Sequence, residues 1–206
     1  MSPRTYHVPH ARKLAAKFTR DRILAATRDL LATPTGVRDF SLQAVGDAAG
    51  VARMTVYYQF KSKAGLLEAL FDWLAEAGGM DQLPRVFQTP DPRAALAHFV
   101  VTFVNFWASD RLVLRRLRAL AATDPELEPV FRARDERRRQ GLRVLVARLG
   151  LLSHPAERIA VLHALTSFEI FDDLSHGGRP PEEVAALLQR LVEATVASTA
   201  APDRIE

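Results

Sequence analysis

Residues 41–67 read SLQAVGDAAGVARMTVYYQFKSKAGLL, and this segment constrains the fold more than any other. Its first apolar residues recur at the spacing of one helix face: Leu42, Val45, Gly46 and Ala49. Gly50 then provides a stop. In a second short helix Val56 and Phe60 take the apolar positions, which leaves the polar and tyrosine side chains free. This arrangement is typical of a helix-turn-helix, whose second helix enters the major groove of DNA.

The sequence of this segment also resembles the pattern of a known protein family. The stretch AAGVARMTVYYQFKSKAGLL is similar to AxxxGVSxGTLYxHFxSKxxLL, a pattern of the DNA-binding domain in the TetR family of transcriptional repressors, and the likeness covers roughly residues 19–75. Ala52 stands where the family usually has a Ser or Thr cap, a loss of about 1 kcal/mol. Gly46 replaces the usual alanine, at a cost in helix propensity of up to about 1 kcal/mol. A three-helix bundle that does not touch nucleic acid is the alternative.

The bulk composition excludes several classes of protein. A chain of 206 residues can hold one or two domains, and the pattern favours two. The absence of cysteine excludes a disulfide framework, thiol chemistry and a zinc finger. The most apolar run, residues 99–107, is too short for a membrane span, and the start has no apolar signal region. We expect a soluble cytoplasmic protein with no membrane partner, metal or cofactor.

Positive charge is concentrated near the N-terminus. Residues 1–63 contain 11 Lys and Arg against 4 Asp, whereas the other 143 residues contain 17 basic and 20 acidic groups. Since neutralised phosphates release counterions, this excess would give DNA affinity independent of sequence; a solvated basic face is the alternative. Residues 1–18 are expected to form a basic arm that either follows phosphates or is disordered.

Helical periodicity without any strand pattern predicts an all-α protein of about nine helices. The first helix is expected to begin at residue 19 or 20 and to end near Pro34 and Gly36. Ser41 should cap the second helix, and an apolar stripe over 66–74 predicts a connector helix that ends at Gly78-Gly79. A proline-rich loop over 83–92 precedes the remaining helices, expected at about 93–108, 110–122, 125–149, 155–175 and 181–199.

The resemblance implies a division of labour between two domains. Residues 19–65 would form the three-helix, helix-turn-helix DNA-binding domain, and residues 66–206 a helical domain for effector binding and dimerisation. The implied DNA-binding residues are Ser41, Leu42, Gln43, Arg53, Met54, Thr55, Tyr57, Tyr58, Gln59 and Lys63. Arg53 suits a guanine edge, whereas Tyr57 and Lys63 are expected to hold phosphates, which set register but not sequence. Tyr58 points about 100° away from Tyr57, and its packing against the connector is an alternative.

Two C-terminal helices offer a surface for pairing with a second copy of the chain. Residues 159–174 are apolar nearly all round their helix, and the final helix repeats apolar residues at intervals of three and four. They resemble the family's four-helix dimer interface; completing a monomer core is the alternative. The predicted interface residues are Ile159, Leu162, Thr166, Ile170, Leu187, Leu188, Leu191 and Thr195.

The middle helices contain most of the aromatic residues and an unusual pair of arginines. In the family this domain encloses a small-molecule pocket, although an aromatic stripe is more often plain core. The effector-binding candidates are Trp73, Phe99, Phe103, Phe106, Trp107, Phe131, Arg134, Arg138, Phe168 and Phe171. Both arginines continue the apolar stripe of the 125–149 helix, so we expect them to face inward. Buried charge requires pairing, with an acidic ligand or, as we favour, with an internal partner such as Glu169, Asp172 or Asp173.

Taken together, these patterns predict a ligand-responsive transcriptional repressor that binds a palindromic operator in double-stranded DNA as a homodimer. An unknown small-molecule effector would release it. An activator or an architectural DNA-binding protein on the same scaffold is the alternative. An enzyme is disfavoured, because the chain has no HExxH motif, no GxSxG elbow, no phosphate-binding glycine loop and no metal-ligand cluster.

Overall fold

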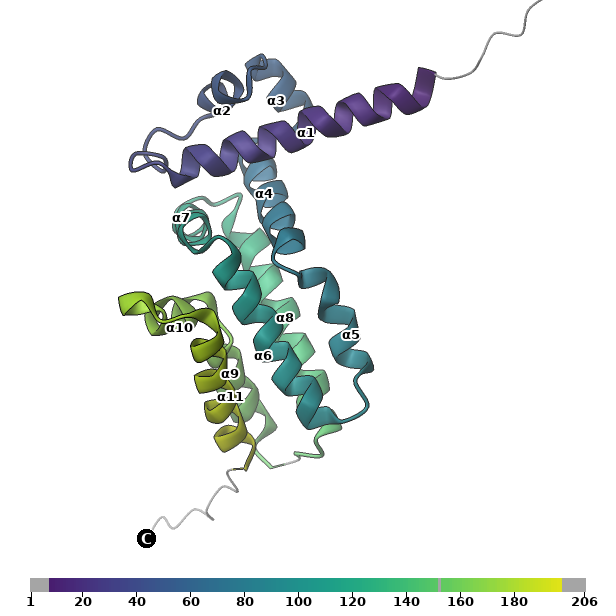
Figure 1. Ribbon diagram of the computed structural model, residues 1–206, viewed down its shortest axis with the longest axis vertical. Coiled ribbons are helices and arrows are strands. Elements are labelled where there is room, and N and C mark those ends of the chain that lie inside the picture. The colour runs from purple at the N-terminus through teal and green to yellow at the C-terminus, as the bar shows by residue number, and fades with distance from the viewer. Residues whose placement is uncertain (1–7, 152, 198–206) are drawn as a thin grey trace, which may run out of the picture. The chain divides into compact units, whose positions relative to one another are not determined.

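The computed structural model describes residues 8–151 and 153–197, and this part of the chain contains eleven α-helices, two 3-10 helices and no strand (Figure 1). The chain divides into two compact units. The first runs to Trp73 and includes Arg116–Leu127; the second comprises Leu74–Arg115 and the residues from Glu128 onward. The expected all-α class is confirmed, and the described helices outnumber the nine expected.

The first unit is built around four helices from the N-terminal third of the chain. They are α1 (Val8–Ala32), α2 (Leu42–Ala49), α3 (Arg53–Phe60) and the start of α4 (Lys63–Ala77). Their shared core consists of side chains that are at most 7% exposed: Ile23, Leu24, Leu31, Phe40, Val45, Ala49, Val56, Phe60, Leu66, Leu67 and Leu70. This core holds α2 and α3 against α1.

The turn between α2 and α3 follows from local sequence signals. The Ser41 hydroxyl caps α2 by accepting the Ala44 backbone N–H at 3.1 Å. Gly50 ends α2 with φ of 61°, a left-handed conformation that favours glycine. A Cβ on Gly46 would lie 2.9 Å from the Val51 carbonyl oxygen, so this glycine permits the close approach of the turn. Ala52 provides no side-chain cap for α3, as expected from its residue type.

Helix α1 begins eleven residues before the expected start at residue 19. The expectation of an arm over residues 1–18 was wrong for residues 8–18, which are helical, while residues 1–7 lie outside the described part. The reason is local: residues 12–18 read RKLAAKF, without glycine or proline and with several strong helix formers. Pro9 falls in the first turn, where proline is compatible with a helix.

The second unit contains the remaining long helices. Its elements are η1 (Met80–Gln82), α5 (Leu83–Gln88), α6 (Pro92–Ser109), the start of α7 (Arg111–Ala121), α8 (Glu128–Arg148), α9 (Pro155–Leu165), α10 (Phe168–Leu174), η2 (His176–Gly178) and α11 (Pro181–Ala197). Helix α6 packs against α5, α8, α10 and α11, and its apolar side chains are buried at the centre of the unit.

Two expected elements differ from the structure. The loop expected over 83–92 contains α5, because Pro84 occupies the first turn, where its missing N–H costs no hydrogen bond. The single helix expected over 155–175 is divided into α9 and α10. Ser167 causes the break, since its hydroxyl accepts the Ile170 N–H at 3.3 Å and so starts a new helix.

Candidate nucleic-acid interface and body

Helix α3 presents a broad outward face. Val56 and Phe60 are 0% and 5% exposed, and these two residues fix the buried side of the helix. On the opposite side Met54 is 50%, Tyr57 46% and Tyr58 66% exposed. Their rings and thioether could approach base edges or sugars in a DNA groove. Arg53, which begins the helix, is exposed as well.

Tyr58 is the most exposed of these residues, and the alternative in which it packs against the connector is not found. Sequence reasoning gave it too little weight because it considered only the angle to Tyr57. The buried pair Val56 and Phe60, four residues apart, places residue 58 nearly opposite the core. That spacing was the signal available in the sequence.

The other implied DNA-binding residues lie on α3 itself, at the start of α2 or at the start of α4. Thr55 and Gln59 are half-buried on one flank of α3, and Leu42 is half-buried at the start of α2. Gln43 is exposed but donates its amide to the Asp47 carboxylate at 2.8 Å. The Lys63 ammonium lies 5.4 Å from the centroid of the Phe40 ring. Ser41 is exposed while its hydroxyl oxygen caps α2, so its O–H can still donate to a phosphate.

Arg20 of α1 holds the C-terminal end of α3, a role that sequence reasoning missed. Its Nη1 donates to the Gln59 carbonyl oxygen at 3.4 Å, and its guanidinium lies 4.4 Å from the centroid of the Phe60 ring. Arg20 shares a helix face with Ile23 and Thr27, both fully buried. Its position on that face, three residues before Ile23, was the available signal.

The aromatic residues of the body form a continuous buried chain. Phe99, Phe103, Phe106, Phe131 and Phe171 are each at most 6% exposed. Neighbouring rings along α6 and α10 lie in contact, with centroid separations of 4.7 Å for Phe99–Phe103, 4.4 Å for Phe106–Trp107 and 5.6 Å for Trp107–Phe168. The Trp107 indole N–H also donates to the Thr166 carbonyl oxygen at 3.1 Å. In this conformation these rings act as core, and Trp73 on α4 is half-buried.

Arg138 is buried as expected, and an acidic residue on its own helix pairs with it. Its Nη2 contacts Asp135 at 3.2 Å, and its Nη1 donates to the Thr166 hydroxyl at 2.9 Å and to the His163 carbonyl oxygen at 2.5 Å. The favoured internal ion pair is therefore confirmed for Arg138. Of the predicted acidic partners, Asp172 pairs with Arg111 and Arg115 instead. Arg134 is half-buried on the same helix.

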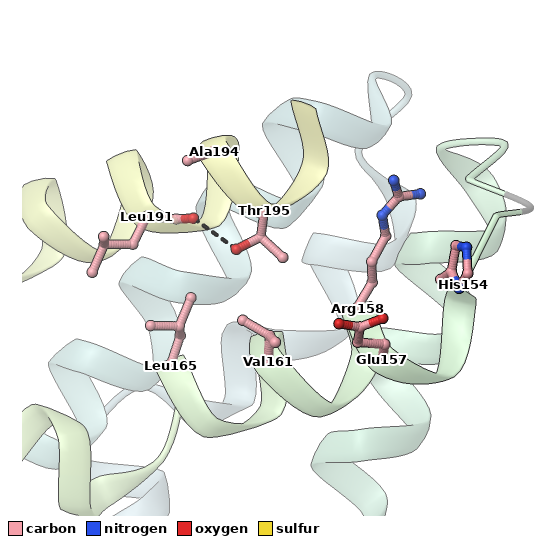
Figure 2. A pocket seen from close by; sticks show the side chains of 8 residues that line it. All are labelled: His154, Glu157, Arg158, Val161, Leu165, Leu191, Ala194 and Thr195. Atoms are coloured by element: carbon pink, nitrogen blue, oxygen red, sulfur yellow. Dashed lines mark hydrogen bonds between the residues drawn. The ribbon is translucent and has the colours of Figure 1, made fainter. Parts of the chain in front are cut away.

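A groove lies between α9 and α11 on the surface of the second unit. It has a volume of about 510 Å³ and is lined by His154, Glu157, Arg158, Val161, Leu165, Leu191, Ala194 and Thr195 (Figure 2). Figure 2 shows Val161 and Leu165 on one wall and Leu191 on the other. Val161 of α9 and Leu191 of α11 are 40% and 41% exposed, so two large apolar side chains face solvent on neighbouring helices. None of the candidate effector-binding residues lines this groove or the hollow of about 350 Å³ between α5 and α6.

The predicted dimer residues separate into two groups. Leu191 is exposed, and four others are half-buried: Ile159, Ile170, Leu187 and Thr195. Leu162, Thr166 and Leu188 are 0%, 3% and 1% exposed, so assigning them to an outward surface was wrong. They point inward because α9 and α11 pack against each other and against the rest of the protomer.

Both parts of the chain match family models. The model described as "Bacterial regulatory proteins, tetR family" matches residues 23–70, and the model described as "Tetracyclin repressor-like, C-terminal domain" matches residues 91–194. The chain belongs to the TetR family. TetR-family proteins are DNA-binding transcription regulators rather than enzymes, and the helix-turn-helix described above is their DNA-binding element.

Solved structures share this TetR fold. A transcriptional regulator from Rhodococcus sp. Rha1 is 22% identical with a TM-score of 0.68, over 86% of this chain and 95% of that one. NalD from Pseudomonas aeruginosa, described as the secondary repressor of the MexAB-OprM multidrug efflux pump, is 23% identical with a TM-score of 0.64, over 88% and 96%. FadR from Bacillus subtilis, in complex with stearoyl-CoA, is 16% identical with a TM-score of 0.67, over 86% and 97%. No curated protein matches the chain.

The structure describes residues 8–151 and 153–197 of this TetR-family regulator. No helix among them is long and apolar enough to cross a lipid bilayer. Nor do they bring together three His, Cys, Asp or Glu side chains in an arrangement that could hold a metal ion.

Asp172 on α10 joins α10 to the start of α7. Its carboxylate accepts Arg111 Nε at 2.5 Å, and Arg115 Nε and Nη2 at 2.8 and 2.6 Å. Arg111 also donates to the Asp172 and Ser175 carbonyl oxygens. Burial raises the pKa of Asp172, but the hydrogen bonds from Arg115 and Arg111 outweigh burial and lower the pKa below its ordinary value.

We expect Asp172→Asn to lower the free energy of unfolding by about 2 kcal/mol at pH 7, because charge-assisted hydrogen bonds are lost. A carboxyl group with a lowered folded pKa stabilises the protein above its unfolded pKa and loses that contribution as pH falls through the folded value. The gap between wild type and variant should therefore close below about pH 4. Urea unfolding at several pH values measures it, and a gap of constant size down to pH 3 would contradict the assignment.

Proposed function

We propose that this TetR-family regulator represses transcription by binding a palindromic DNA operator as a homodimer, and that a small-molecule effector releases it. The observation that carries the proposal is the outward face of α3. Arg53, Met54, Tyr57 and Tyr58 are exposed there, while Val56 and Phe60 anchor the opposite side in the core. Large exposed side chains that do not pack in the core, on a segment with excess positive charge, are suited to contacting base edges in a groove of duplex DNA.

The proposal includes a second protomer because the DNA-reading helix of one protomer is short. Helix α3 has eight residues and is therefore about 12 Å long, enough to reach only a few base pairs. Repressors of this design place two readers on half-sites about one helical turn apart. The groove between α9 and α11, with exposed Val161 and Leu191, offers an apolar surface for a two-fold contact with another protomer.

The effector part of the proposal is supported by one of the similar solved structures, which holds a ligand. FadR was solved in complex with stearoyl-CoA. In this chain the rings of α6 and α10 are packed against one another, so an effector that reaches them must separate these helices. Helix α4 passes without a break from the first unit into the second. A ligand that binds one tilt of α4 more tightly than another would change the spacing of the two readers.

Arg53→Ala tests the DNA-reading assignment. We expect the variant to lose about 1–3 kcal/mol of affinity for the operator and to relax the preference at one base position. By contrast, Lys63→Ala should weaken binding to all duplexes alike, since a phosphate contact carries no sequence information. Titration of operator fragments selected from the source genome, at fixed salt, measures both effects.

The matched control for Arg53→Ala is Arg22→Ala, which removes the same charge from the first unit. Arg22 is exposed on the side of α1 away from the face that bears Arg20 and Ile23. Unchanged operator affinity for Arg53→Ala would overturn the base-reading role. Transcription in vitro decides the direction of control: addition of the protein should lower the transcript, and a rise would favour activation.

A further inference from the structure

The N-terminal half of α1 continues beyond the core of the first unit. Helix α1 has 25 residues, and every residue from Arg12 to Phe18 is exposed, whereas Ile23, Leu24, Thr27 and Leu31 are at most 3% exposed. We call residues 12–18 the α1 extension. Figure 1 shows α1 as one uninterrupted rod that extends past α3 in the first unit.

The orientation of the α1 extension is set by the buried part of the same helix. Lys13 and Lys17 precede Arg20 by seven and three residues, and these spacings place all three on one helix face. Arg20 faces the end of α3, through its hydrogen bond to the Gln59 carbonyl oxygen and its contact with the Phe60 ring. The two lysines therefore extend the α3-facing side of α1 outward from the motif.

The charge on this face has no acidic counterpart in the preceding sequence. Asp21, the first acidic residue of the chain, lies one turn after Lys17, whereas Arg12 and Lys13 have no Asp or Glu within a turn on either side. Lys13 and Lys17 are four residues apart, a like-charge spacing that destabilises an isolated helix by about 0.2–0.5 kcal/mol. Lys61, exposed directly after α3, lies at the same end of the motif as Arg20. An anionic partner would relieve this repulsion.

We propose that the α1 extension binds the sugar-phosphate backbone of duplex DNA immediately outside the half-site read by α3, with Lys13 and Lys17 each on a phosphate. The inference rests on the proposed DNA-binding function and adds a contact beyond the helix-turn-helix. Lys13 and Lys17 are separated by four residues of helix, which is about 6 Å along the helix axis. Such contacts lengthen the footprint and increase affinity without changing sequence preference.

The test compares Lys13→Gln/Lys17→Gln with wild type on the selected operator and on a random duplex. Each lost phosphate contact lowers the magnitude of the slope of log K against log salt by about 0.9. A bound homodimer loses two contacts from each protomer, so the magnitude should fall by about 4 on both duplexes. Operator affinity at 150 mM salt should fall on the order of a hundredfold or more. Hydroxyl-radical footprinting should show lost protection at the outer edges of the site only. Lys13→Arg/Lys17→Arg should restore slope and footprint.

Leu14→Ala/Phe18→Ala is the matched control for the α1 extension. Leu14 and Phe18 are 43% and 71% exposed and lie about 100° round the helix from the lysines, so this variant should keep the wild-type slope. An unchanged slope and footprint for the lysine-to-glutamine variant would overturn the proposal. If wild type binds duplexes without preferring its operator, the repressor function fails instead, and the slopes on the random duplex still decide the role of the α1 extension.

Discussion

Replacing Phe99 by alanine is expected to lower the free energy of unfolding by about 3–5 kcal/mol. Phe99 is fully buried on α6, 4.7 Å from the Phe103 ring centroid and 6.3 Å from that of Phe87. A Cβ on Gly141 of α8 would lie 3.2 Å from the Phe99 ring, so α8 approaches the ring closely. The substitution would leave a cavity that these neighbours cannot fill without backbone movement.

Urea denaturation measures the free energy of unfolding of Phe99→Ala and of a control variant, Val144→Ala. Val144 is 42% exposed on α8, and its truncation should cost less than about 0.5 kcal/mol. The result also separates the two interpretations of the aromatic residues. A cost below about 1 kcal/mol for Phe99→Ala would mean that the ring lines a space meant for a ligand rather than the core.

Introducing charge into the groove between α9 and α11 is expected to separate the proposed dimer. In Val161→Asp/Leu191→Asp each protomer would place two carboxylates in the apolar contact, and the two-fold symmetry would double them. The separated protomers should lose about 100-fold or more in operator affinity, because the second half-site is no longer bound intramolecularly. Weak binding to random duplex should persist, since the first unit keeps its charge.

Sedimentation velocity and operator titration measure the two consequences. Val144→Asp is the matched control, since Val144 has the same degree of exposure but does not line the groove. It should leave the sedimentation coefficient and operator affinity at wild-type values. A double variant that stays dimeric would show that the protomers pair through another surface. A wild type that sediments as a monomer would exclude operator binding by a preformed dimer.

The elements that sequence analysis located best are those with local causes. Ser41 and Gly50 determine the two ends of α2 through a side-chain cap and a left-handed backbone, and both signals are visible within a few residues. Gly78 ends α4 as expected, although its close approach to Phe106 in the second unit could not be foreseen. Weaker local signals were misjudged: the propensity of residues 12–18 extends α1, and Ser167 divides α9 from α10.

The parts that sequence analysis could not determine depend on which helices meet. Asp172 was expected to pair with Arg134 or Arg138, but it accepts from Arg111 and Arg115, which lie about sixty residues earlier. Leu162 and Leu188 carry the same apolar pattern as the exposed Leu191, and only helix packing separates inner from outer positions. Periodicity identifies that a face is apolar, whereas tertiary contacts decide what covers it.

The way α3 is attached has a consequence for how such a regulator can diverge. Val56, Phe60 and the brace from Arg20 hold the helix by its inner side and its C-terminal end. Arg53, Met54 and Tyr58 lie on the solvent side of α3 and do not pack in the core, so replacing them should change the stability of the fold little. Descendants of this chain can exchange those side chains, and with them the promoters under control, while conserving the scaffold and its thermal tolerance.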